Sequence, residues 1–289
     1  MKTLKITQNT SAEKVTDNTI SKLYKLTVGD STTPPITQNV ELEGYIRADH
    51  GKRAQIKYLK EKFPKLQIDV PESGLYLDFD DPVFEQFIIH TWFPEQSGVT
   101  LANALSINNM PDGIFDNFEN ASEIETIDFR YSSFNSWNTG FFGLPKLKYV
   151  YIKRVESITR LNSFHKDAVI EKCIIGYVNY RIAGGPYAQN CHIKILGIKS
   201  FNTGKTDTYG DYLTRSSTID KLYLGDPVAH DIHFGYGDDI NRIGEIYVPV
   251  GMKETFAAMD GWSKRDPALG FIEYDFYTDP DGIFAELNT

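Results

Sequence analysis

A short apolar pattern that recurs at a nearly constant interval is the feature that most constrains how this chain can fold. Each copy has an apolar residue, two variable residues, a second apolar residue, one variable residue and a third apolar residue. The copies start at residues 124, 147, 170, 193, 219 and 243, so the successive steps are 23, 23, 23, 26 and 24 residues. Such a step predicts stacked structural units rather than one closed core. The copies are Ile124-Ile127-Phe129, Leu147-Val150-Ile152, Ile170-Cys173-Ile175, Ile193-Leu196-Ile198, Ile219-Leu222-Leu224 and Ile243-Ile246-Val248.

An aromatic residue stands six positions before each of the first four starts. These residues are Phe118, Phe141, Phe164 and Tyr187, each 23 positions from the next. Two periodic signals in one register favour a structural origin over chance. If the units stack, the rings are expected to form a column beneath the sheet, in offset or edge-to-face contact.

The repeated pattern predicts one β-strand and one return segment in each unit. Because a single unit cannot bury its apolar side alone, neighbouring strands should lie about 4.8 Å apart in a parallel sheet, with the Ile, Leu and Val positions inside. Units of about 20–29 residues with an L-x-x-L-x-L strand are typical of leucine-rich repeats. We therefore expect an α+β fold based on a leucine-rich-repeat solenoid.

The order of aromatic residue, short polar turn and I-x-x-I-x-I strand resembles the BspA-like bacterial leucine-rich-repeat family. The strand that ends in Val-Pro-x-Gly at residues 248–251, the helical run Lys253–Met259 and the following Gly261-Trp262 resemble the C-terminal cap of that family. Residues 81–115 resemble the helical region that precedes its repeats. The similarity covers roughly residues 80–275. It implies surface attachment or adhesion through contacts with protein or glycan.

Four parts are expected along the chain. They are a polar N-terminal arm that serves as an anchor or assembly contact, an N-terminal α/β region with the helical cap of the solenoid, a solenoid of about six coils, and a C-terminal cap. Their bounds are 1–38, 39–117, 118–250 and 251–289.

Within the second part, residues 39–70 are expected to form a strand, a helix and a strand. Leu42 and Leu66 are 24 residues apart, which suggests an extra, helix-bearing repeat unit. A further helix is expected to begin after Asp81, with Pro82 in its first turn, and to cover the open end of the sheet.

Charge and hydropathy exclude several classes of partner. The formal net charge is −9, from 30 Lys and Arg against 39 Asp and Glu, whereas nucleic-acid backbones require a basic footprint. No apolar run reaches 18 residues, so no membrane-spanning helix is expected. The first twenty residues contain no apolar stretch of a secretory signal, which favours a place in a virion or another large assembly. The alternative is a cell-surface or extracellular place, if a leader was removed.

The two cysteines, Cys173 and Cys191, are too few for a disulfide framework. Cys173 occupies an inward strand position, whereas Cys191 stands two residues before the start of the next copy. These different registers place their Cα atoms beyond bridging distance. We expect two free thiols, with Cys173 in the core.

Motifs for catalysis or cofactor binding are incomplete. Gly204-Lys205-Thr206 lacks the preceding glycine of a phosphate-binding loop, because Lys199 stands at that position. His230, Asp231 and His233 are weak candidates for a metal site, in a stretch that favours a polar turn. We expect no catalytic residue, cofactor or metal. Asp78, Asp80 and Asp81 could pair as acidic groups, but an Asp before Pro82 is also an ordinary helix cap.

The outward side of the predicted sheet is the candidate binding face. Residues two, four and six positions past each start should point outward, and on this acidic chain they are rich in Tyr and Lys. Such side chains anchor interfaces, and Tyr also stacks on sugars, whereas cross-strand pairing of tyrosines is an equally good explanation. The candidate residues are Arg130, Tyr149, Tyr151, Lys153, Lys172, Lys199, Lys221, Tyr223 and Tyr247.

These features together predict a non-catalytic leucine-rich-repeat interaction or adhesion protein. The favoured role is a structural or attachment component of a phage-like virion, in its head or tail. The alternative is a bacterial cell-surface adhesin that binds host protein or glycan. A weaker alternative is a glycan-acting enzyme with its site in the 199–242 loops. Assembly partners, a surface glycan and a homo-oligomer within an assembly all remain open as partners.

Overall fold

The computed structural model describes residues 2–6, 19–28, 40–156, 164–178, 191–201, 218–227, 242–258, 269–276, 278 and 282–287. The chain divides into two compact units, which are described separately. The N-terminal unit comprises Met1–Phe79 and Glu95–Asn103, and the sheet unit comprises Asp80–Pro94 and Ala104–Thr289.

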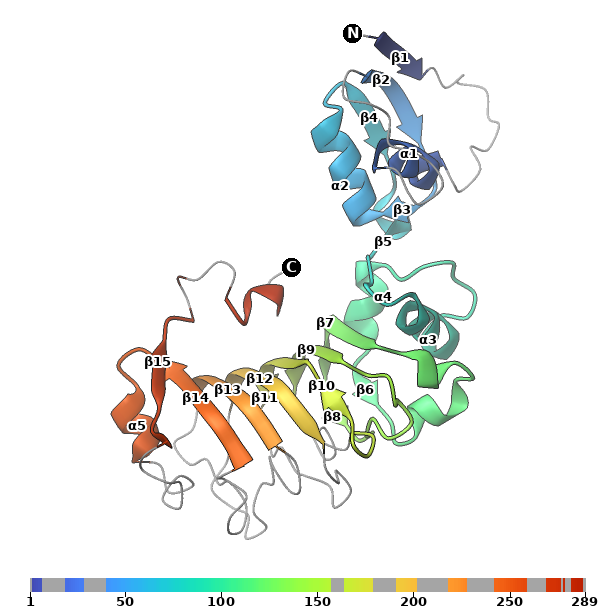
Figure 1. The fold of residues 1–289 in the computed structure, drawn as a ribbon. Helices are drawn as coiled ribbons and strands as arrows, with labels where there is room; N and C mark the ends of the chain where they lie inside the picture. The colour runs from blue at the N-terminus through green and yellow to red at the C-terminus, as the bar shows by residue number, and fades with distance from the viewer. Residues whose placement is uncertain are drawn as a thin grey trace. The chain divides into compact units, whose positions relative to one another are not determined.

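The sheet unit is built on a parallel β-sheet that joins eight of the described strands (Figure 1). Seven of them follow the order β15-β14-β13-β12-β11-β9-β7. The eighth, β10, directly precedes β11 in the chain and also pairs with β12. The fold is therefore α+β, with a mainly parallel sheet. The bounds are β7 Thr126–Phe134, β9 Tyr149–Val155, β10 Val169–Ile170, β11 Lys172–Val178, β12 His192–Phe201, β13 Thr218–Pro227, β14 Ile243–Pro249 and β15 Ile272–Tyr274.

The pairing register follows the sequence repeat. Val150 lies opposite Ile127 on one side and Cys173 on the other, and these three residues hold the same place in successive copies of the pattern. Further along, Leu196 pairs with Leu222 across the longest step of the repeat. The predicted side-by-side parallel arrangement of these strands is confirmed, because equivalent apolar positions must face the same side to be buried together.

The inward positions form ladders of buried side chains, and the ladder has one more position than the sequence pattern predicted. Val155 and Val178 lie eight residues past their starts and are buried, as are the predicted positions at zero, three and five. Two residues rather than one separate this fourth position from the third. Strict alternation therefore breaks there, and the three-residue apolar pattern of the sequence does not include this position.

The aromatic column is present, but its first member differs from the prediction. Phe141 and Phe164 stack with ring centroids 5.1 Å apart, and Phe141 also contacts Trp137 at 5.7 Å and Phe115 at 6.1 Å. Phe118 instead lies against Phe87 in an edge contact, with centroids 5.6 Å apart. Tyr187 lies outside the described residues.

Helix α3 (Pro82–Trp92) covers the β7 edge of the sheet, as predicted (Figure 1). Phe84 is fully buried and meets Phe129 edge-on at 5.0 Å. Asp81 fixes this junction with both of its carboxylate oxygens. Oδ1 accepts hydrogen bonds from the N–H groups of Val83 and Phe84 at 2.8 and 3.1 Å and so caps the helix. Oδ2 accepts hydrogen bonds from the N–H groups of Glu125 and Thr126 at 2.7 and 2.9 Å and so caps the edge of the sheet.

The opposite end of the sheet carries α5 (Lys253–Ala257), whose Phe256 is fully buried. The expected helical run to Met259 is thus shorter among the described residues. The sequence did not reveal β15, which adds a strand beyond β14 through the pairing of Tyr247 with Ile272.

The N-terminal unit contains a separate parallel sheet of order β1-β2-β4, with α1 and α2 packed together. The predicted strand, helix and strand over 39–70 are present, but Leu66 pairs with Gly44 rather than Leu42, so the two leucines are not equivalent positions. Parts of the N-terminal arm belong to this unit, because Ile20 and Leu23 are buried in its core. The bounds are β1 Lys2–Ile6, α1 Thr19–Val28, β2 Val40–Arg47, β3 Gly51–Lys52, α2 Arg53–Lys62, β4 Leu66–Asp69 and β5 Leu75–Tyr76.

Several short elements complete the described chain, and none of its helices is long and apolar enough to cross a bilayer. The short elements are η1 Glu72–Gly74, α4 Leu101–Ser106, β6 Asn109–Met110, η2 Ile114–Asn117, η3 Ala121–Glu123, β8 Ser136–Trp137 and η7 Ala285–Leu287.

Candidate binding surface

The predicted outward residues line up in rows across neighbouring strands of the sheet unit. One row runs through Asp128, Tyr151, Ile174, Gly197, Tyr223 and Tyr247, each paired with the next. A second row brings Thr126, Tyr149 and Lys172 side by side. We call this side of the sheet the outward face.

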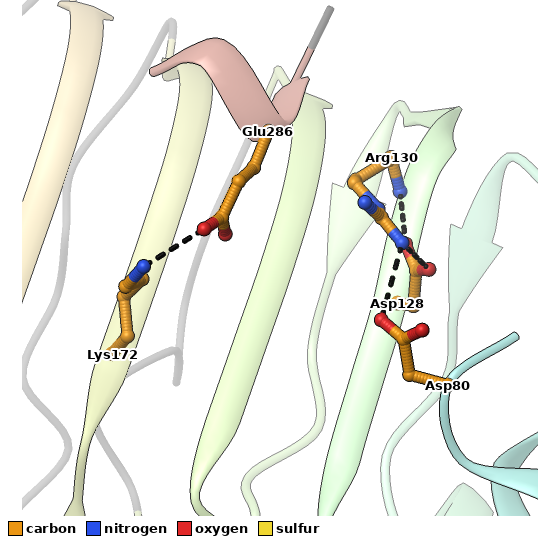
Figure 2. A network of polar contacts seen from close by, with 5 residues as sticks. All are labelled: Asp80, Asp128, Arg130, Lys172 and Glu286. Atoms are coloured by element: carbon orange, nitrogen blue, oxygen red, sulfur yellow. Dashed lines mark hydrogen bonds and ion pairs between the residues drawn. The ribbon is translucent and has the colours of Figure 1, made fainter. Parts of the chain in front are cut away.

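Arg130 makes intramolecular contacts at the β7 end of the outward face (Figure 2). Its Nε and Nη2 donate to the two carboxylate oxygens of Asp128 at 2.8 and 2.6 Å, and its Nη2 lies 3.7 Å from Asp80 Oδ2. Its guanidinium also lies over the Tyr151 ring, 5.3 Å from the centroid. The hydrogen bonds to Asp128 are the main reason why the pKa of Arg130 is raised. Because only 14% of the side chain is exposed, Arg130 is poorly placed to anchor a partner.

The centre of the outward face is covered by the chain's own C-terminus, which sequence reasoning did not anticipate. Tyr151 and Ile174 are buried there in one cluster with Phe284 and Leu287. Tyr149, Ile195 and Tyr223 pack against the rim of this cluster and are partly buried. We call residues 282–287 the C-terminal segment.

A carboxylate from the C-terminal segment completes the contact. Glu286 Oε1 lies 2.8 Å from Lys172 Nζ (Figure 2), and Glu286 also accepts a hydrogen bond from the Tyr151 hydroxyl. Partial burial opposes ionisation of Glu286, but the hydrogen bonds from Lys172 and Tyr151 and the positive charge of Lys172 outweigh it, so its pKa is lowered. Burial, followed by the bond to Glu286, raises the pKa of Tyr151. Lys172 is thus half of an ion pair that joins the sheet to the C-terminal segment.

The two tyrosines toward the β14 end form a cross-strand pair. The rings of Tyr223 and Tyr247 are stacked with centroids 4.4 Å apart and planes 7° apart, and the Tyr247 hydroxyl donates to Glu245 at 2.7 Å. The bond to Glu245, followed by burial, raises the pKa of Tyr247. Tyr274 and Tyr223 are in an edge-to-face contact with ring centroids 5.6 Å apart. This geometry agrees with the stabilising role that the sequence left open for these tyrosines.

Two lysines among the candidates remain exposed. Lys153 on β9 and Lys221 on β13 are solvent-accessible, and Lys221 Nζ lies 3.7 Å from a carboxylate oxygen of Glu245. Lys199 on β12 is partly buried. The outward face therefore has a covered centre. We call its two exposed lysines, Lys153 and Lys221, which stand on strands separated by β11 and β12, the open flank.

The remaining candidates for chemistry have structural roles or lie outside the described residues. Asp78 Oδ2 accepts the N–H of Ala54 at the start of α2, at 2.7 Å. Cys173 and Cys191 are buried free thiols, as predicted, and burial raises the pKa of each to about 12. Residues 204–206 and 230–233 are not among the described residues. Within the described ranges, no three His, Cys, Asp or Glu side chains gather as metal ligands.

No protein-family model, curated protein or solved structure matches this chain.

Proposed function

We propose that the sheet unit is a leucine-rich-repeat solenoid of the BspA-like kind. The support is the parallel register, in which the apolar positions that the repeat makes equivalent lie opposite one another from β9 to β14. A regular repeat with buried Ile and Leu ladders is typical of that architecture. Solenoids of this kind act through extended surfaces.

We further propose that the protein is a non-catalytic interaction protein that binds a macromolecular partner through the open flank of the outward face. The observation that carries this proposal is the exposure of Lys153 and Lys221 on one face of a chain whose net charge is −9. Basic side chains on an acidic protein favour a partner surface with acidic groups. Tyr247 adds aromatic area on the strand next to that of Lys221.

Variants of the two exposed lysines test this role. The double variant Lys153→Glu and Lys221→Glu is expected to weaken capture of the native partner by about tenfold or more, because both charges are reversed. Lys166→Glu, which reverses an exposed charge in the turn before β10, is the matched control. Capture would be measured by cross-linking and mass spectrometry with the native source. Equal capture by the double variant and the control would refute a role for the open flank.

The favoured setting is a structural or attachment component of a phage-like virion, and the alternative is a bacterial cell-surface adhesin. Antibody detection after density-gradient separation distinguishes them. A virion component sediments with nucleic-acid-containing particles and resists a high-salt wash. An adhesin instead remains with intact cells and is removed by external protease, and this result would overturn the virion proposal.

A further inference from the structure

The C-terminal segment is seated on the outward face as a separate short peptide would be. Among the described residues, its backbone hydrogen bonds are local, from the Ala285 N–H to Gly282 O and from the Leu287 N–H to Phe284 O. Its contacts with the sheet are made by side chains. Phe284 and Leu287 are 3% and 8% exposed, so both are anchors.

The sheet is shaped to receive these anchors. A Cβ atom at Gly197 would lie 3.1 Å from Phe284 Cε1, and one at Gly176 would lie 3.4 Å from Leu287 Cδ1. An added Cβ would also lie 2.8 Å from Ile174 Cδ1 at Gly197 and 2.2 Å from Lys153 O at Gly176, so the two glycines serve the packing of the sheet as well as the contacts with the anchors. Ile174 is fully buried in one cluster with both anchors.

One polar side chain, Glu286, fixes the orientation of the C-terminal segment. It stands between the two anchors and pairs with Lys172 on β11 (Figure 2). It also accepts a hydrogen bond from the hydroxyl of Tyr151 on β9. A charged residue between two apolar anchors makes the site selective for a sequence pattern. A peptide that has the anchors but no carboxylate would bind less well, because it leaves Lys172 without this ion-pair partner.

We propose that the outward face of β9, β11 and β12 is a binding site for a short peptide of a partner protein that carries an aromatic residue, a carboxylate two positions later and an aliphatic residue next to it. The C-terminal segment occupies this site within the chain and is displaced when the partner binds. This inference rests on the proposed interaction function and names a partner chemistry for the centre of the same face.

The C-terminal segment is covalently attached to the sheet unit, and this attachment determines how strongly it competes with an added peptide. A tethered segment has an effective concentration of about 1 mM, and a peptide with two anchors and one ion pair is expected to bind with a dissociation constant of about 10–100 µM. Competition from the tethered segment therefore weakens binding of an added peptide about 10–100-fold.

The probe is a fluorescent synthetic peptide with the sequence of residues 282–289, titrated into the chain that ends at residue 281 and into the full chain. Saturable binding to the shortened chain, with about 10–100-fold weaker binding to the full chain, is expected. In the shortened chain, Lys172→Glu should weaken binding about tenfold, whereas the control Lys166→Glu, in the turn before β10, should change it less than about threefold.

Three outcomes would overturn the inference. A shortened chain that retains its circular dichroism and cooperative unfolding but does not bind at about 1 mM peptide shows that the face is no peptide site. If the shortened chain does not fold, the full-length double variant Phe284→Ser and Leu287→Ser replaces it. If that variant also fails to fold, the segment is a fixed part of the core. If the full chain forms dimers that exchange their C-terminal segments, the occupant of the site is a second copy of this chain and not a partner protein. The open-flank variants Lys153→Glu and Lys221→Glu test the proposed function independently of all these results.

Discussion

Replacement of Asp81 should destabilise the sheet unit far more than replacement of its neighbour Asp80. In Asp81→Ala the helix loses its cap, which costs about 1 kcal/mol. The N–H groups of Glu125 and Thr126 also lose their acceptor, at about 1 kcal/mol or somewhat more each, since residue 126 is buried. The expected loss in free energy of unfolding is about 2–4 kcal/mol. At roughly 2–4 °C per kcal/mol for a unit of this size, the Tm falls by about 4–16 °C.

Tryptophan fluorescence during urea unfolding measures this loss in the relevant unit, because all three tryptophans, at positions 92, 137 and 262, belong to the sheet unit. Asp81→Asn keeps an oxygen for the helix cap but places an amide where the second carboxylate oxygen stood, so it isolates the strand-edge half of the effect. Asp80→Ala is the control, because its side chain is 77% exposed and should contribute no more than about 0.5 kcal/mol. Equal stability of Asp81→Ala and Asp80→Ala would refute the double-capping explanation.

Three further predictions concern the packing of the sheet unit. Gly176→Ala should lower the free energy of unfolding by about 1–3 kcal/mol in urea titrations, because the added Cβ would lie 2.2 Å from the carbonyl oxygen of Lys153. Phe141→Ala should lower it by about 3–5 kcal/mol in the same assay, since the ring is fully buried in the aromatic column. Cys173 and Cys191 should not react with Ellman's reagent at about pH 8 in the folded chain, because burial raises both pKa values to about 12, and both should react in urea. Rapid labelling of the folded chain would contradict the buried placement.

The interior of the sheet unit was predictable because each repeat meets the same physical constraint. A strand slipped by one residue would expose its whole apolar set, so the apolar pattern determines the register. The aromatic column shows the limit of this reasoning. Phe115 and Phe118 are both near the expected position, and the constant spacing selected Phe118, although Phe115 is the one of the two whose ring contacts Phe141. The constant spacing identifies the repeat, but the local turn determines which aromatic side chain joins the aromatic column.

A second regularity was present in the sequence and was missed. Glu125, Lys148, Glu171 and Lys194 each stand one residue after a repeat start, and their charges alternate. In the structure Lys148 pairs with Glu125 at 2.9 Å and Lys194 pairs with Glu171 at 2.8 Å. Such half-exposed pairs contribute little stability, but like charges in these places would repel one another across neighbouring strands. Alternating charges at the repeat interval are therefore a usable signal of strand adjacency.

The covered centre of the outward face could have been suspected from residues that do not suit a solvent-exposed surface. Ile174, Ile195 and Gly197 occupy outward positions, where an open sheet would be expected to carry polar or aromatic side chains. Ile174 is fully buried, and Gly197 leaves the space that the ring of Phe284 fills. What no repeat pattern reveals is the covering element, because residues 282–287 lie beyond the last repeat and follow no period.

The two halves of the outward face therefore require different kinds of partner contact. A partner can reach Lys153 and Lys221 without any change in the protein, so binding there would depend on charge and weaken as salt screens the lysines. Access to Tyr151 and Lys172 requires the C-terminal segment to leave, so a partner would associate slowly there. Binding there would be less sensitive to salt, because two apolar anchors supply most of the contact and Lys172 supplies a single, partly buried ion pair. The salt dependence of partner binding thus reports which half is used. A binding constant that falls steeply between about 0.05 and 0.5 M salt assigns the contact to the open flank, and one that hardly changes assigns it to the covered centre.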